Sequence, residues 1–463
     1  MKRMLLAPIA LALLAFSAPA AAEIADAEVV EMRDRALADD LAWEIVEGLV
    51  TEVGPRLAGT EAEARARDWM VARLNALGFS NVRVEEFMMP VWVRGAEEAE
   101  ILAPFPQKFH VAALGRSAAT PAEGITAEVA AFDSVAALAA APEGSLAGKI
   151  AYVTHHMART QDGSGYGFAG PTRWIAPSLA AARGAVAAVV RSVGTDWHRN
   201  PHTGGTTWAE GVAPIPAGAL SNPDADTLER MFERAGGRPV TMRLLLTPRW
   251  IGERASGNVI AEVPGSDRQA GEILIGGHLD SWDLSPGAFD NAAGVAITTA
   301  AAKNVMDQGT PKRTIRLVLF GAEEVGLFGG RDYRERHRDE NIVFVSEADF
   351  GADRVWRIEN GLAEANRPLF ERVAAAVAPL GIARAQNRAG AGADLGAWAR
   401  GGVAAIDLAQ SGLRYFDLHH TPDDTLDKID PAQLQQNVAA WTAMLAIVAN
   451  AGEDILPVPA EEE

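Results

Sequence analysis

One stretch decides the fold: Glu272-Ile273-Leu274-Ile275-Gly276-Gly277-His278-Leu279-Asp280. In it, a short apolar run ends at two glycines, a histidine and an aspartate. Such a run is typical of a strand that is buried on both faces of a parallel sheet. Similar runs occur at residues 314–320, 341–345 and 403–408, and longer segments with helical periodicity separate them. The sequence therefore predicts an α/β fold with a mostly parallel mixed sheet flanked by helices.

Helical periodicity also appears before this region. Apolar residues recur at three- and four-residue intervals over residues 39–51 and 61–77, which predicts two amphipathic helices. Thr60 ends the loop between them and is a suitable N-cap for the second helix. Alternation over residues 82–93 then indicates strands. Within the sheet region, helices are expected over residues 291–308, 367–379 and 431–449.

The middle of the chain has a different texture from the rest. Residues 121–248 contain short apolar runs broken by loops rich in Gly, Pro and Asn, which predicts a separate small module. The main domain is then expected to consist of residues 23–120 and 249–455, and the second part holds the candidate site. Residues 456–463 are expected to form a flexible tail.

The amino terminus has the pattern of a secretory signal peptide. Lys2 and Arg3 precede an apolar run over residues 4–16, and small residues follow up to residue 22. We therefore expect residues 1–22 to be a signal peptide and the protein to be periplasmic or secreted. The remaining sequence has no apolar run long enough to span a bilayer, so no membrane anchor is expected after cleavage.

Composition excludes some classes of function. The 463 residues are 48% hydrophobic, include no cysteine, and carry a formal net charge of −19 at pH 7. An acidic surface repels phosphate backbones, so nucleic acid is not an expected partner. Without disulfides, the fold depends on its own core and on any bound metal.

Several short motifs favour structural roles. A G-x-G-x-x-G match at residues 165–170 does not follow directly on a strand, so no dinucleotide cofactor is expected. No G-x-S-x-G motif supports a serine hydrolase. The remaining paired histidines are interpreted as loop residues: His155, His156, His198 and His202. Pro201 argues against a helix that would bring the last two to one face.

Polar side chains gather where the predicted parallel strands end, which is where functional groups of open α/β sheets collect. They are imidazoles and carboxylates, with no thiol: His278, Asp280, Asp290, Glu323, Glu324, Asp349 and His420. This is the ligand chemistry of zinc in a hydrolytic site. A single hydrolytic zinc usually takes three protein ligands. Five candidate ligands therefore suffice for two zinc ions if one carboxylate bridges them: His278, Asp290, Glu324, Asp349 and His420.

The two residues of this set that are not candidate ligands, Glu323 and Asp280, have specific interpretations. Glu323 and Glu324 leave a strand in different directions, so one can bind metal while the other acts as general base on a metal-activated water. Asp280 lies two residues after His278 and is placed to accept its other ring N–H, which would fix the tautomer.

These motifs resemble those of a family of two-zinc exopeptidases that includes bacterial aminopeptidases and glutamate carboxypeptidases. The resemblance rests on residues 278–281, 289–294, 321–327 and 420–425, and on the amino-terminal segment 54–60. The middle module resembles a protease-associated insert domain. Residues 346–349 and 415–420 are most similar to the plasma glutamate carboxypeptidase, or carboxypeptidase Q, branch.

The resemblance implies a role for each candidate ligand. Asp290 would bridge the two ions, His278 and Asp349 would complete one, and Glu324 and His420 would complete the other. Glu323 would be the general base.

Three alternatives stay open. Glu347 could replace Asp349, and His419 competes with His420, although the spacing to Asp424 favours His420. Asp394 would either shape the substrate end of the cleft or serve as a turn residue.

The sequence thus predicts an exported zinc-dependent exopeptidase, an aminopeptidase or dipeptidase, that hydrolyses short peptides. One alternative is a two-zinc hydrolase of another amide, such as an acyl amino acid or a cyclised amino terminus. A second is a non-enzymatic binding protein on the same fold. The resemblance also leaves room for a homodimer.

Overall fold

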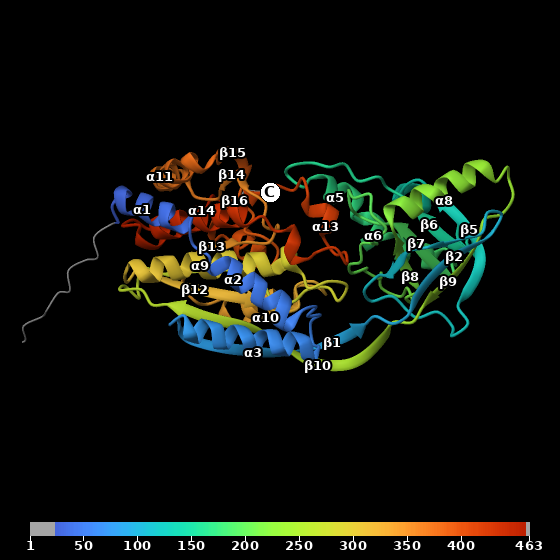
Figure 1. The fold of residues 1–463 in the computed structure, drawn as a ribbon, viewed down its shortest axis with the longest axis horizontal. Helices are drawn as coiled ribbons and strands as arrows, with labels where there is room; N and C mark the ends of the chain where they lie inside the picture. The colour runs from blue at the N-terminus through green and yellow to red at the C-terminus, as the bar shows by residue number, and fades with distance from the viewer. Residues whose placement is uncertain (1–23, 460–463) are drawn as a thin grey trace, which may run out of the picture.

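The computed structural model describes residues 24–459, which form two eight-stranded sheets placed side by side (Figure 1). The predicted signal peptide, residues 1–22, lies outside the described residues, as do the last four residues of the predicted tail. None of the described helices is long and apolar enough to cross a membrane.

The first sheet is mixed and mostly parallel, as predicted. Its strand order is β1 (Ser80–Val93), β10 (Arg249–Val263), β12 (Thr314–Phe320), β11 (Glu272–His278), β13 (Ile342–Glu347), β16 (Ala404–Gln410), β14 (Val355–Asn360) and β15 (Ala383–Arg388). The central strands β12, β11, β13 and β16 are parallel, whereas β1 and β10 form a long antiparallel pair along one edge. The carboxyl ends of the central strands therefore meet at one edge.

Helices cover both faces of this sheet. One face carries α1 (Asp26–Ala36), α2 (Leu41–Gly48), α9 (Ala293–Gln308), α11 (Arg367–Val377) and α14 (Pro431–Asn450). The apolar side chains of α9 and α14 are buried almost throughout, because these two helices pack against each other and the sheet. On the other face, α10 (Phe328–His337) and α12 (Gly396–Arg400) contribute Tyr333 and Trp398 to a smaller core.

Two predicted helices have different ends from those expected. The pattern over residues 39–51 forms α2 followed by a π-helical turn, η1 (Leu49–Val53). The helix expected from residue 291 begins at Ala293, because the turn η2 (Ala288–Ala292) precedes it, and in this turn Asp290 and Asn291 have non-helical backbone angles. The helix α3 (Glu61–Ala76) begins as predicted, with Thr60 as its N-cap.

The second sheet has its own apolar cores. Its order is β3 (Gln107–Phe109), β2 (Glu97–Ala103), β9 (Thr241–Leu246), β5 (Ile125–Phe132), β6 (Ile150–Val153), β7 (Ala187–Arg191), β8 (Ala217–Leu220) and β4 (Val111–Ala113). It begins at Glu97, before the residue 121 at which the sequence placed the insert. The earlier start follows from pairing, since β2 pairs with β9 and β4 pairs with β8.

The two sheets are joined by two short stretches of chain. Strand β1 leads into β2, and β9 leads back into β10, so both connections follow the long β1–β10 pair (Figure 1). The helices α5 (Gly165–Ala169), α6 (Pro171–Trp174) and α13 (Tyr415–Leu418) lie between the sheets. The carboxyl ends of the central strands thus face elements of the second sheet.

Candidate metal centre

A cavity of about 400 Å³ lies between the two sheets. From the first sheet and its loops it is lined by His278, Asp290, Glu323, Glu324, Asp349, His419 and His420. From the second it is lined by Arg116, Tyr166, Arg173, Trp174, Thr206 and Thr207. Six of the seven residues singled out from the sequence therefore meet at one cavity, and Asp280 lies buried behind it.

The first group of donors is built around His278, the last residue of β11. Its Nε2 lies 3.0 Å from Asp290 Oδ1 and 3.3 Å from Asp349 Oδ1. Burial alone would lower the pKa of His278, but Asp349, Asp280 and Asp290 raise it well above its ordinary value. These three donors can occupy one coordination sphere.

The second group shares Asp290 with the first. His420 Nε2 lies 3.0 Å from Glu324 Oε2 and 3.4 Å from Asp290 Oδ2. The two oxygens of Asp290 thus face two different histidines, which is the arrangement that a bridging carboxylate requires. The donor set of two imidazoles and three carboxylates fits a pair of zinc ions, with open positions left for water and substrate.

Both histidines turn their other nitrogen to a main-chain carbonyl. His278 Nδ1 lies 3.0 Å from the carbonyl oxygen of Asp280, and His420 Nδ1 lies 3.2 Å from that of Thr203. A carbonyl oxygen can only accept, so it favours a proton on Nδ1 and leaves Nε2 free as a ligand.

The structure changes the role expected of Asp280. The sequence suggested that this residue accepts the ring N–H of His278, and it does so through its main-chain carbonyl. Its carboxylate lies 3.7 Å from the ring and instead accepts the amide N–H groups of Glu323, at 3.0 Å, and Glu324, at 3.3 Å. Asp280 therefore orients the glutamate pair as well as the histidine.

The two adjacent glutamates are buried in an acidic environment. Burial raises the pKa of Glu323 well above its ordinary value, and Asp349 and Asp394 raise it further, while His278 opposes them. Burial and Asp290 have the same effect on the pKa of Glu324. Cations at this site would offset the repulsion that these carboxylates otherwise experience.

The geometry bears on the alternatives that the sequence left open. His419 Nε2 lies 3.8 Å from Asp290 Oδ2, farther than His420, and its ring stacks on that of His420. Glu347 accepts an N–H bond from Leu395 at 3.0 Å. Asp349 lines the cavity, whereas neither Glu347 nor Asp394 is among the lining residues. Of the two acids Asp349 and Glu347, Asp349 is therefore the one exposed to the cavity. His420 lies closer to Asp290 than His419 does, and donor atoms of Asp290, His419 and His420 are all close enough to share one ion.

Two residues that support the site, Asp424 and Arg56, lie in motifs noted in the sequence, but the sequence did not show what they do. Asp424 accepts the amide N–H groups of Phe289, at 2.6 Å, and Asp290, at 3.0 Å, and so holds the turn η2. The fully buried Arg56 donates to the carbonyls of Leu279, Pro286 and Gly287. Burial lowers the pKa of Arg56 to about 10, although Asp424 opposes this shift. Such bonds to main-chain groups leave no spacing pattern in the sequence.

The fold and the site can be compared with known proteins. The model of peptidase family M28 matches residues 258–445, which include all the candidate ligands. Carboxypeptidase Q of Bos taurus is 33% identical over 426 residues, which cover 91% of this chain and 87% of the bovine protein.

Two solved structures have the same overall fold. A peptidase M28 precursor from Shewanella amazonensis SB2B is 44% identical, with a TM-score of 0.91 over 94% of this chain and 99% of that chain. BSAP, a zinc aminopeptidase from Bacillus subtilis, is 18% identical, with a TM-score of 0.64 over 90% of this chain and 97% of that chain.

The similarity thus extends through both sheets, and the matched segment contains the histidines and carboxylates that converge on the cavity. The chain belongs to peptidase family M28.

Proposed function

We propose that the protein is a two-zinc exopeptidase that hydrolyses short peptides, with Glu323 as general base. The observation that carries this proposal is the position of Asp290, whose two carboxyl oxygens face His278 and His420. His278 and Asp349 would hold one ion with it, and Glu324 and His420 would hold the other. When bound, zinc supplies a Lewis acid for the substrate carbonyl and lowers the pKa of water towards about 7.

Glu323 is the residue best placed to move a proton. It lies beside Glu324 in the loop after β12, lines the cavity, and has its amide held by the Asp280 carboxylate. Its carboxylate can take a proton from the attacking water and return it to the departing amine. No covalent intermediate is needed, because water itself attacks the substrate carbonyl and Glu323 only transfers its proton.

The shape of the cavity favours small substrates. A volume of about 400 Å³ bounded by both sheets has room for a few residues and not for a folded chain. The relatives include a carboxypeptidase and an aminopeptidase, which act at the ends of peptides. Together with the small cavity, this supports hydrolysis near one end of a short peptide. The pattern of residues 1–22 supports export, which would place the reaction in the periplasm or outside the cell.

Metal content and dipeptide hydrolysis, measured on the same purified protein, test the proposal. We expect about two zinc ions per chain, loss of hydrolysis on chelation, and recovery when zinc is added back. Glu323→Gln should keep both ions and the fold while turnover falls at least about a hundredfold. Asp290→Ala should lose metal as well as turnover.

Two results would contradict this division of roles. Equal loss of zinc in Glu323→Gln and Asp290→Ala would remove the distinction between base and ligand. A folded wild-type protein without zinc and without hydrolysis of dipeptides, acyl amino acids or peptides with a cyclised amino terminus would favour the binding-protein alternative.

A further inference from the structure

A loop of the second sheet, residues 194–205, contacts the residue proposed as a zinc ligand of the first. The main-chain N–H of Thr203 donates to the carbonyl of His420 at 3.0 Å, and the carbonyl of Thr203 lies 3.2 Å from His420 Nδ1. One residue of the loop thus contacts both the main chain and the ring of His420. His420 has a φ of +61°, a left-handed conformation that costs free energy in a residue other than glycine.

We propose that Thr203 is a positioning residue of the metal centre, which sets the tautomer and the backbone conformation of His420 from the second sheet. This inference rests on the proposed function. A histidine that binds metal through one ring nitrogen usually donates the N–H of the other to a carbonyl or carboxylate, which fixes its tautomer and orientation. For His278 the same task falls to Asp280, only two residues along the chain.

The neighbours of His420 Nδ1 show why the carbonyl matters. Arg173 Nη1 lies 3.2 Å from this nitrogen and 3.3 Å from the Thr203 oxygen. Arginine can only donate, so a direct bond to Nδ1 would place the ring proton on Nε2 and block it as a ligand. The Thr203 carbonyl favours the opposite tautomer and accepts from Arg173 at the same time.

Thr203 itself is fixed by its hydroxyl group. Its side chain is fully buried, and Oγ1 donates to the carbonyl of Ala113 at 2.8 Å and accepts from Arg94 Nη2 at 3.0 Å. Arg94 also forms an ion pair with Asp283 in the loop after β11. The position of the Thr203 carbonyl is thus tied to both sheets.

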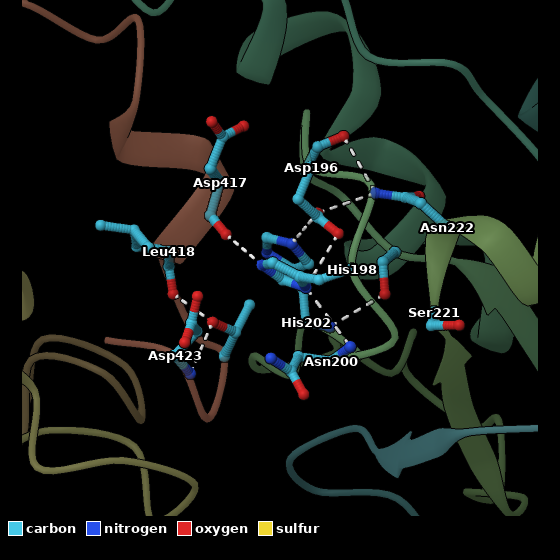
Figure 2. Close-up of polar contacts among 12 residues, drawn as sticks. Asp196, His198, Asn200, His202, Ser221, Asn222, Asp417, Leu418 and Asp423 are labelled. Atoms are coloured by element: carbon cyan, nitrogen blue, oxygen red, sulfur yellow. Dashed lines mark hydrogen bonds and ion pairs between the residues drawn. The ribbon is translucent and has the colours of Figure 1, made fainter. Parts of the chain in front are cut away.

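A buried histidine–aspartate pair anchors the residue before Thr203 (Figure 2). His202 Nε2 lies 2.5 Å from Asp196 Oδ1, and the amide N–H of His202 donates to Ser192 Oγ at 2.9 Å. Asn222, at the start of α8 (Asn222–Arg234), donates to the same aspartate oxygen at 3.0 Å. The side chains of Asp196 and His202 are buried, so the pair anchors the loop to the second sheet.

The same loop also holds the helix that precedes His420. The amide N–H of Thr195 donates to the carbonyl of Phe416 at 2.9 Å, and its hydroxyl donates to Asp417 Oδ1 at 2.8 Å. His198 Nε2 lies 2.8 Å from the carbonyl of Asp417, as Figure 2 shows. Both ends of the loop therefore contact the segment that presents His420.

Zinc affinity, measured by competition with a chromophoric chelator, tests the proposal without relying on activity. Thr203→Val keeps the shape of the side chain and removes both hydroxyl bonds. We expect zinc at one of the two sites to bind at least about tenfold more weakly, the range found when such supporting groups are changed. Thr203→Ser, which keeps the hydroxyl, should restore wild-type affinity, and Asp196→Asn should weaken the same site.

Thr120→Val is the matched control. Thr120 is also buried, beside β9 of the second sheet, and its hydroxyl donates to the carbonyl of Leu246 at 3.1 Å and accepts its amide N–H at 3.2 Å, away from the loop. It should keep wild-type zinc affinity. The unfolding midpoint of each zinc-free variant separates a local effect from a general loss of structure.

The outcomes separate this inference from the proposed function. Wild-type affinity in both Thr203→Val and Asp196→Asn, or an equal loss in Thr120→Val, would overturn the role of Thr203 and leave the two-zinc site intact. A wild-type protein that binds no zinc would overturn both.

Discussion

Glu63 shows how one buried carboxyl group near the site depends on its neighbours. Its side chain is fully buried, accepts bonds from Ser256 Oγ at 3.1 Å and the Gly59 amide at 3.3 Å, and lies 3.6 Å from Arg67. Burial raises the pKa of Glu63 from 4.5 to about 7, although Arg67 lowers it. In the folded protein this group therefore holds its proton to a higher pH than it does in the unfolded chain.

This shift predicts a pH dependence of stability. Between about pH 4.5 and pH 7 the folded protein binds more protons at Glu63 than the unfolded chain, so stability falls as pH rises through this range. The shift corresponds to about 3 kcal/mol of unfolding free energy. Glu63→Gln should remove this contribution. The free energy of unfolding of the zinc-free protein, measured by denaturant titration, should then fall less between pH 5 and pH 8 than it does in the wild type. Glu61→Gln, on the exposed face of α3, is the control, and an equal effect in both variants would refute the assignment.

At the scale of elements, the ends of helices decide where the site residues lie. The helix α14 has 20 residues and begins just after the segment that contains His420 and Asp424. Its N-cap is Asp430, whose Oδ1 accepts the amide N–H groups of Ala432 at 2.9 Å and Gln433 at 3.4 Å. The cap stops the helix from extending back into the ligand segment.

Loss of this cap should have a measurable cost. Asp430→Ala leaves two amide groups without their side-chain acceptor and should lower the free energy of unfolding by about 1 kcal/mol. Asp430→Asn keeps an oxygen acceptor and should change it by much less. Denaturant titration of both variants checks the prediction, and equal losses would show that the charge, and not the cap, is responsible.

Elements that are buried on both faces were predictable, and those set by distant contacts were not. The strand β11 follows from the apolar run Ile273–Ile275, β12 follows from an apolar run interrupted by Arg316, and α14 follows from its periodicity and from Pro431. The helix expected from residue 291 begins only at Ala293, because the preceding turn η2 depends on Asp424, more than a hundred residues farther along the chain. The sequence pattern within 288–292 carries no trace of that contact.

At the scale of the whole molecule, the cavity belongs to both sheets. The sequence predicted the residues that the first sheet brings to it, because their side chains carry the chemistry and follow strand ends. It did not predict the contribution of the second sheet, since the Thr203 carbonyl acts on His420 over 217 positions and any residue has such a carbonyl. The side chains that meet at the cavity were thus accessible from the sequence, and the contacts that orient them were not.

Because both sheets line the cavity, we predict that bound metal stabilises the folded protein in addition to supporting its activity. Asp290 lies between His278 at the end of β11 and His420 in the segment before α14, and His420 is in turn bonded to the second sheet, so bound ions would connect segments far apart in the chain. A ligand that binds only the folded state stabilises it by about 3 kcal/mol at a hundredfold excess over its Kd.

Chelation should therefore lower the midpoint of thermal unfolding of the wild-type protein by several degrees, and added zinc should restore it. Asp290→Ala provides the matched comparison, because without the bridging carboxylate it should unfold at the same temperature with and without chelator. Calorimetry of both proteins measures the difference. Equal shifts in the two proteins would mean that the stabilising metal binds elsewhere, and no shift in either would mean that ions at this site do not connect the two sheets.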